Sequence, residues 1–274
     1  MLSRLFLKRR VIMSRVCPLY SGSTGNSTYI GTKSGGILVD AGASFRGICN
    51  ALERAGGSYS EIKAVAVTHE HSDHIKGLKA FLSKTGASLI ASKGTLNALA
   101  NADIIPVNTV VMEIGDEPLE IDGIQIMRFA TSHDCLDSSG YSFMLPDKKK
   151  VTVCTDLGVV TDEVRKAVKA SDVLLFESNH DVEMLKNGPY PPILKVRIMS
   201  DKGHISNNAC ASELKEFLNS GTQRFILGHL SQKNNTPALA RSAAEASLMD
   251  IGAQNGKDYI LTAALPTGNG VTVI

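Results

Sequence analysis

The residues with the greatest chemical potential lie together in one short stretch, 68–74. The side chains in it that can bind a metal are His69, Glu70, His71, Asp73 and His74. The apolar, β-branched segment 62–67 predicts a buried strand, so these side chains follow a strand end, where α/β proteins build their sites. Imidazole nitrogen and carboxylate oxygen suit Zn²⁺, Mn²⁺ or Fe. The stretch therefore predicts a metal site; the alternative is a surface loop rich in histidine by chance.

The spacing of the histidines decides how they can share an ion. Two histidines on one face of a helix need i and i+4, whereas His69, His71 and His74 stand at i, i+2 and i+5. On an extended segment, side chains at i and i+2 point the same way. We therefore expect His69 and His71 to bind one ion, and Asp73 and His74, beyond the turn, to reach a second.

The order of residues 69–74, HEHSDH, resembles the HxHxDH signature of the metallo-β-lactamase superfamily. The resemblance implies a four-layer αββα sandwich, in which two mixed β-sheets are flanked by helices. It also implies two divalent metal ions, with Mn or Zn expected and Fe possible. The di-iron redox members have a carboxylate at the position of His71, so the histidine found here favours hydrolysis.

The resemblance further implies which residues complete the two metal sites. His133 is expected to join His69 and His71 on the first ion, because that pair needs a third partner. His229 is expected to join Asp73 and His74 on the second ion. Asp156 ends a predicted buried strand and is expected to bridge both ions, since a carboxylate has two oxygens. Asp40 is expected to orient a histidine ligand by accepting its second N–H.

A narrower resemblance covers nearly the whole chain from about residue 14. Its segments are 21–26 (SGSTGN), 132–134 (SHD), 177–180 (ESNH), 203–207 (GHISN) and 227–234 (LGHLSQKN). Together they resemble the YycJ/WalJ family, which implies a 5′-to-3′ exonuclease acting on single- or double-stranded DNA, with Mn²⁺. The segment 203–206 also resembles tRNase Z-like phosphodiesterases, which implies His204 as the proton donor to the leaving oxygen and Glu177 as its orienting partner. With these two, Asp73 completes the expected catalytic residues.

Several further residues are candidates for substrate or supporting contacts. The small-residue loop that ends in Asn26 can bring backbone N–H groups to an anion, or it is a plain hairpin turn. Asp134 is expected to support His133. His180 either lines the substrate site or is a satisfied polar residue at a strand end. Lys195 and Arg197, expected in extended alternation, can touch phosphates or face solvent.

Strands alternating with helices must position these side chains, and the pattern predicts an α/β sandwich. Thr161 is expected to cap a helix that starts at residue 162, and Pro237 to occupy the first turn of the last long helix. Strands are expected over 107–114, 121–130 and, closing the second sheet, 259–264 and 271–274. We expect one domain over 14–274, preceded by a basic, disordered extension over 1–13.

Composition narrows the class of protein. The chain has 274 residues, is 43% hydrophobic and 20% charged, and carries a net charge of +2. This charge is too small to indicate nucleic-acid binding by itself. Five scattered cysteines without a CxxC pair suggest reduced thiols and a cytoplasmic protein. No apolar run is long enough to span a membrane, and no obligate protein partner is expected.

Two other functions remain open from the sequence. One is a small-molecule hydrolase of the same fold, acting on a cyclic nucleotide, thioester or lactone. The other is a nucleic-acid-binding protein without turnover, against which the full set of predicted ligands and His204 argue. A large cap domain between Asp156 and His229 is excluded, because His229 follows Asp156 by only 73 positions and ordinary fold elements occupy this stretch.

Overall fold

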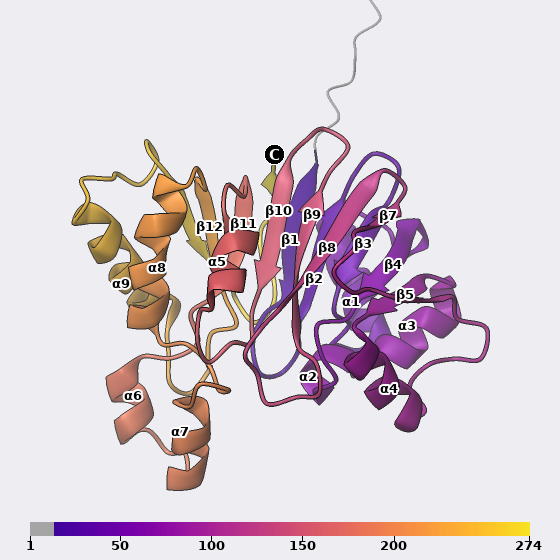
Figure 1. The fold of residues 1–274 in the computed structure, drawn as a ribbon, viewed down its shortest axis with the longest axis horizontal. Coiled ribbons are helices and arrows are strands. Elements are labelled where there is room, and N and C mark those ends of the chain that lie inside the picture. The colour runs from indigo at the N-terminus through magenta and orange to yellow at the C-terminus, as the bar shows by residue number, and fades with distance from the viewer. Residues whose placement is uncertain (1–13) are drawn as a thin grey trace, which may run out of the picture.

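The computed structural model describes residues 14–274, in which two seven-stranded sheets pack face to face. Helices cover the outer face of each sheet, so the predicted four-layer sandwich is confirmed (Figure 1). The expected extension over residues 1–13 lies outside the described residues. Within them, no helix has the length and apolar character needed to cross a membrane.

The two sheets have matching orders of strands. The first runs β14-β1-β2-β3-β4-β5-β6 and is antiparallel from β14 to β3 and parallel from β3 to β6. Its strands are β1 (Arg15–Tyr20), β2 (Ser27–Gly31), β3 (Gly36–Val39), β4 (Ile62–Ala66), β5 (Ser88–Ala91), β6 (Val111–Glu113) and β14 (Thr272–Val273). The second runs β13-β12-β11-β10-β9-β8-β7 and is parallel from β13 to β10. Its strands are β7 (Leu119–Ile121), β8 (Ile124–Ala130), β9 (Ser139–Met144), β10 (Lys150–Cys154), β11 (Val173–Glu177), β12 (Arg224–Gly228) and β13 (Ile260–Ala263).

The helices divide in the same way between the two sheets, and each sheet with its helices is here called one half of the fold. Those of the first half are α1 (Phe45–Arg54), α2 (Ser72–Ile75), α3 (Leu78–Thr85) and α4 (Lys93–Asn101), with a short 3₁₀ turn, η1 (Tyr59–Glu61). Those of the second half are α5 (Asp162–Val168), α6 (Val182–Asn187), α7 (Pro192–Ile198), α8 (Asn207–Asn219) and α9 (Pro237–Met249). The predicted starts of two helices are confirmed: the Thr161 hydroxyl accepts from the Val164 N–H ahead of α5, and Pro237 opens α9.

Three apolar clusters hold the layers together. The central one lies between the sheets and includes Ile37, Tyr141 and Phe143, none of which is exposed to solvent. The other two pack the helices of each half against the outer face of their own sheet. Burial of apolar surface is the main driving force for such packing, so it also fixes how the strand ends of the two sheets meet.

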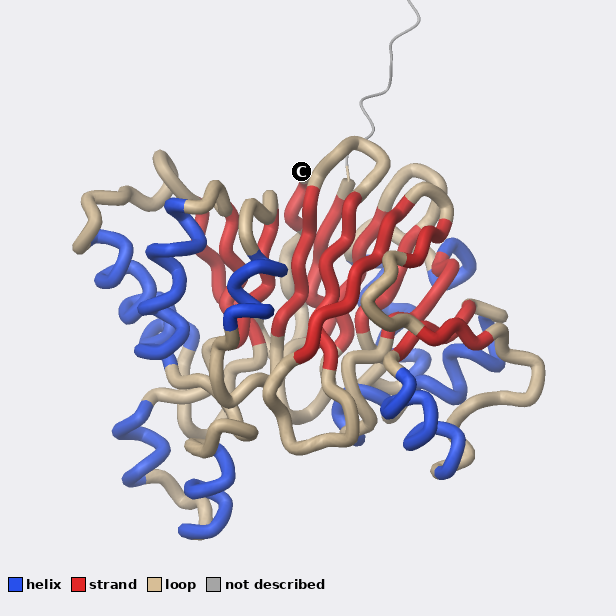
Figure 2. Tube along the Cα trace, in the orientation of Figure 1, coloured by secondary structure: helices blue, strands red, loops and turns tan. Residues whose placement is uncertain are grey.

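Loops gather along the lower edge of both sheets in Figure 2, and the candidate site residues follow strands there. Asp40, Asp156 and His229 follow β3, β10 and β12, and all three have left-handed backbones, with φ of 64°, 60° and 53°. Such a conformation is unfavourable for residues other than glycine and clusters at functional sites. The chain therefore turns sharply at three strand ends that meet at one edge.

Three expectations about elements were wrong. The final strand, β14, pairs with β1 in the first sheet and does not close the second. Lys195 and Arg197 lie in α7, because Pro192 at the start of this segment favours a helical turn over a strand. The strand expected over 107–114 is shortened to β6, since residues 107–110 form a turn and an exposed connection.

Candidate metal centre and active site

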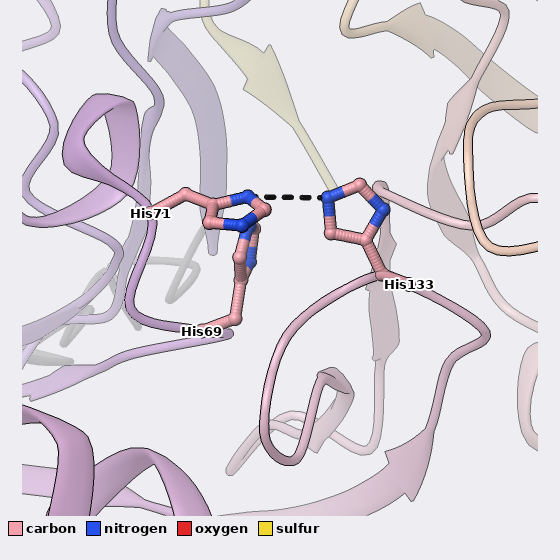
Figure 3. Close-up of side chains that lie close together, drawn as sticks. All are labelled: His69, His71 and His133. Carbon is pink, nitrogen blue, oxygen red and sulfur yellow. Dashed lines mark hydrogen bonds between the residues drawn. The ribbon is translucent and has the colours of Figure 1, made fainter. Parts of the chain in front are cut away.

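The first group of metal-binding side chains is formed by His69, His71 and His133. One ring nitrogen of each lies within 4.8 Å of the others, and His71 Nδ1 is 3.3 Å from His133 Nε2 (Figure 3). His69 and His71 follow β4 of the first sheet, and His133 follows β8 of the second. Residues from both halves of the fold thus form one cluster.

The second group is formed by Asp73, His74 and His229, again with one atom of each within 4.8 Å of the others. Asp73 and His74 lie in α2, which begins directly after His71. His229 reaches the group from the end of β12 in the second sheet.

Asp156 lies between the two groups. One of its oxygens, Oδ1, is 3.5 Å from His229 Nε2 and 3.8 Å from His133 Nε2, and the other, Oδ2, is 3.5 Å from His74 Nε2. A carboxylate that faces donors of both groups has the position that a bridging ligand requires. Its neighbouring histidines hold the pKa of Asp156 well below its usual range although burial opposes this.

Buried polar atoms without partners test whether a metal fits here. His69 Nε2, His229 Nε2 and Asp156 Oδ2 are buried, and none has a hydrogen-bond partner. A buried polar atom left unpaired costs about 1–3 kcal/mol, and these three point into the two donor groups. Divalent ions would satisfy them, and the mixed imidazole and carboxylate set suits Zn²⁺, Mn²⁺ or Fe. The residues present therefore fit divalent metal binding.

Asp40 supports the second group through a hydrogen bond to His74. Its Oδ2 lies 2.8 Å from His74 Nδ1, and its Oδ1 accepts the Thr68 N–H at 2.8 Å. Burial raises the pKa of Asp40. Burial would lower the pKa of His74, but the carboxylates of Asp156 and Asp40 outweigh it and raise this pKa to about 9. These two carboxylates thus favour positive charge at His74.

Glu177 supports the second half of the site in the same way. It is fully buried at the end of β11, and its Oε1 lies 2.9 Å from His204 Nδ1 and 2.8 Å from His229 Nδ1. Its Oε2 accepts the backbone N–H groups of Leu157 and Ile205 at 3.2 Å. Burial would raise the pKa of Glu177, but the two histidines hold it at about 2. Glu177 is therefore an anion that orients two imidazoles at once.

A pocket of about 240 Å³ opens over the two groups. Its lining includes His71, Asp73, His133, Asp156, His229 and His204. His204 binds Glu177 through Nδ1, so its Nε2 is the ring nitrogen left for a molecule in the pocket. The side chain of His204 is only 13% exposed, which keeps its ring orientation restricted.

Comparison with known proteins places the chain in a family. The family model described as a beta-lactamase superfamily domain matches residues 36–230. Exodeoxyribonuclease YycJ of Bacillus anthracis is 36% identical over 243 residues, which cover 88% of this chain and 91% of YycJ. Exodeoxyribonuclease WalJ of Streptococcus pneumoniae strain D39 is 37% identical over 245 residues, which cover 88% of this chain and 90% of WalJ. The chain belongs to the YycJ/WalJ family of the metallo-β-lactamase superfamily.

Solved structures agree with this assignment at the level of the fold. This YycJ/WalJ family member matches the metallo-β-lactamase fold protein YhfI of Bacillus subtilis with a TM-score of 0.72, at 15% identity over 96% of this chain and 99% of YhfI. Zn²⁺-bound PqqB of Methylobacterium extorquens matches with a TM-score of 0.69, at 16% identity over 94% of this chain and 99% of PqqB. The predicted family and enzyme class are confirmed, and the protein is a hydrolase.

Of the remaining candidate residues of this YycJ/WalJ family member, some lie at the site and others lie outside it. Asn26 lies at the centre, with its Nδ2 3.2 Å from Asp73 Oδ2 and 3.0 Å from His74 Nε2. His180 is buried outside the pocket lining, and burial lowers its pKa to about 4. Lys195 donates to the Lys186 carbonyl at 2.7 Å and also lies outside the pocket lining. Arg197 lines the pocket and pairs with Asp134, Nη2 to Oδ1 at 2.8 Å.

A few residues of the site were not predicted from the sequence. Thr68 Oγ1 contacts the Asp40 carboxylate and lies 3.0 Å from His69 Nδ1. Thr68 therefore links His69 of the first group to Asp40, the partner of His74 in the second. Its position directly before the first histidine was the available signal. Leu194 and Ile198 line the pocket; they were missed because their segment was expected to be extended. Tyr190 also lines the pocket. Its Pro- and Gly-rich segment, 187–192, is predicted from the sequence to be a rigid surface loop or part of a substrate groove, but the sequence does not single out Tyr190.

Proposed function

We propose that the protein is a dinuclear metal-dependent phosphodiesterase and, specifically, a 5′-to-3′ DNA exonuclease. The observation that carries the proposal is the pair of donor groups that share Asp156 and leave buried atoms unpaired. The activity named for YycJ and WalJ supports DNA as the substrate class. We further propose a cytoplasmic location, which the five unpaired cysteines of the described chain support.

In this proposal, the two groups hold two ions. His69, His71 and His133 would hold one, Asp73, His74 and His229 would hold the other, and Asp156 would be shared by both. The metal is Mn or Zn, with Fe as a third option. Bound ions at such a site acidify a coordinated water and offset the negative charge on phosphate oxygens.

The chain's own residues would direct attack and departure. Asp73 lines the pocket with a side chain that is 23% exposed, so its carboxylate can orient the incoming water. Glu177 fixes His204 through Nδ1, which leaves Nε2 to donate a proton to the leaving oxygen of the phosphodiester. Asp40 and Glu177 keep His74 and His229 in place while these charges change.

The test is digestion of a duplex labelled at either the 5′ or the 3′ end, in Mn²⁺ and in Zn²⁺, beside Asp156→Ala. The proposal expects early release of the 5′ label as a mononucleotide, late release of the 3′ label, and no release by the variant. Release of the 3′ label first would reverse the polarity. Intact DNA together with hydrolysis of a small phosphodiester would favour the small-molecule hydrolase.

The role of His204 is tested separately. His204→Ala is expected to lose turnover and to keep its metal content, since His204 lies outside the two ligand groups proposed above. Metal analysis of the purified variant checks this. A variant that loses metal together with activity would show that His204 is a ligand and would remove it from the proton-transfer role.

A further inference from the structure

The pocket over the donor groups has a second wall of different chemistry. It is made by residues 181–202, here called the arm, which carry α6 and α7 and stand below the sheets in Figure 1. Tyr190, Leu194, Arg197 and Ile198 of the arm line the same pocket as the candidate ligands. The arm therefore adds an aromatic ring, two aliphatic side chains and a guanidinium to a site that is otherwise polar.

Both ends of the arm are fixed to the backbone of the site. The His204 N–H donates to the Ile198 carbonyl at 2.9 Å, and the Asp181 N–H donates to the Asn234 carbonyl at 2.8 Å. A Cβ on Gly203 would come within 2.2 Å of the Ile198 carbonyl oxygen, so α7 packs tightly against the segment that carries His204. The apolar wall thus has a fixed position relative to the proposed proton donor.

Arg197 is held at the mouth of the pocket by a partner that substrate can replace. Its guanidinium makes a two-point contact with Asp134, whose Oδ1 lies 3.5 Å from His133 Nε2. The Arg197 side chain is 45% exposed, so its guanidinium can be reached from solvent as well as from the pocket. A guanidinium also matches the oxygens of a phosphate in a two-point contact. A phosphate oxygen can therefore share the guanidinium with Asp134 or take the place of its carboxylate.

We propose that the arm wall binds the terminal nucleotide of the DNA end, with Tyr190 stacked on its base and Arg197 on a phosphate oxygen. Leu194 and Ile198 contact the sugar and the edge of the base. Every base presents a flat face to an aromatic ring, so this mode of binding tolerates any sequence. The inference rests on the proposed function and names what the active site recognises: a chain end that carries a base.

The main test compares two DNA substrates that differ only in the terminal nucleotide, which is either intact or lacks its base. Tyr190→Leu is expected to lower kcat/KM about tenfold on the intact end, the size of one base–aromatic stack, and to leave the baseless end unchanged. Tyr190→Phe keeps the ring and is expected to retain the preference. Ile193→Ala, 82% exposed on the same arm and outside the pocket lining, is the matched control. Equal losses on both substrates would overturn the assignment.

A binding measurement separates this inference from the exonuclease activity. The DNA end carries 2-aminopurine as its terminal base, whose fluorescence falls on stacking, and its outermost linkages are phosphorothioates, which resist hydrolysis, so that the metal-loaded protein binds without cleavage. Quenching by the wild type that Tyr190→Leu abolishes supports the arm even where no nuclease activity is found. Quenching that survives in Tyr190→Leu overturns it. Arg197→Ala is expected to weaken this binding several-fold, and Lys195→Ala, whose ammonium is bound within the arm, to leave it unchanged.

Discussion

The two halves of the sandwich contribute to the site in different ways. The first half supplies four candidate ligands from a single stretch, His69 to His74, which runs from the end of β4 into α2. The second half supplies His133, Asp156 and His229 from three separate strand ends. A local motif fixes the first set, whereas only the packing of a whole sheet brings the second set together.

The two sets of candidate ligands are also held in place by different residues. The first-half ligands are supported mainly by Asp40 and Thr68, which lie one strand apart. The second-half residues are tied by Glu177, which contacts His204, His229 and the backbone after β10. If both halves form one centre, changes in either must damage the same activity.

The largest effect is expected from Asp156, the residue that faces both groups. Asp156→Asn is expected to abolish hydrolysis of DNA and to reduce bound metal, because a neutral amide cannot replace a carboxylate between two cations. Metal analysis and a nuclease assay check this. Asp250→Asn, on an exposed ion pair with Lys215, is the control and should retain both. Full metal content with normal activity in Asp156→Asn would contradict the proposed role of Asp156 as a ligand shared by both groups.

Removal of metal is expected to lower thermal stability. Each ion that binds only the folded chain at about 1,000 times its dissociation constant stabilises it by about 4 kcal/mol. For a chain of this size, the loss of one such ion on chelation corresponds to a fall in Tm of roughly 8–16 °C, and the loss of two to a larger fall. Thermal melts with and without chelator measure it. Asp156→Asn should show a much smaller change, and an equal fall in both proteins would point to an effect unrelated to the centre.

The supporting carboxylates allow a direct comparison of the two halves. Glu177→Gln and Asp40→Asn each remove one charge without changing shape, and such changes commonly reduce metal affinity or activity by about 10–100-fold. Glu177→Gln is expected to have the larger effect, because Glu177 contacts two imidazoles and Asp40 contacts one. Titration of metal-free protein with Mn²⁺ measures both. A larger loss of Mn²⁺ affinity in Asp40→Asn would show that metal binding depends more on the supporting residues of the first half.

The smallest effects are expected on stability, from backbone packing around each half. A Cβ on Gly42 would come within 1.6 Å of the Asp73 carbonyl oxygen, and one on Gly203 within 2.2 Å of the Ile198 carbonyl oxygen. Gly42→Ala and Gly203→Ala are expected to lower the free energy of unfolding by about 1–3 kcal/mol, with Gly42→Ala the worse. Denaturant melts measure this against Gly115→Ala, which meets no atom within 4 Å.

The same contrast explains what the sequence could predict. The motif at 69–74 and the strand that precedes it are local, so the resemblance to the fold family and the candidate ligands of the first half could be taken from this one stretch. The supporting contact of Glu177 with His229 could not be predicted, because it depends on the register of β11 and β12. The arm was misjudged since alternating charge at Lys195 and Arg197 fits a strand as well as a helix, and Pro192 at the helix start decides between them. The pairing of β14 with β1 joins the two ends of the described chain and leaves no local signal.

The most direct test is the number of metal ions per chain in the wild type, His71→Ala and His229→Ala after loading with Mn²⁺ or Zn²⁺ and removal of excess ion. One histidine belongs to each proposed metal site, and each comes from a different half of the fold. Two ions are expected in the wild type and about one in each variant, with DNA hydrolysis lost in both variants. One ion in the wild type, or two ions in His229→Ala, would contradict a shared two-ion centre.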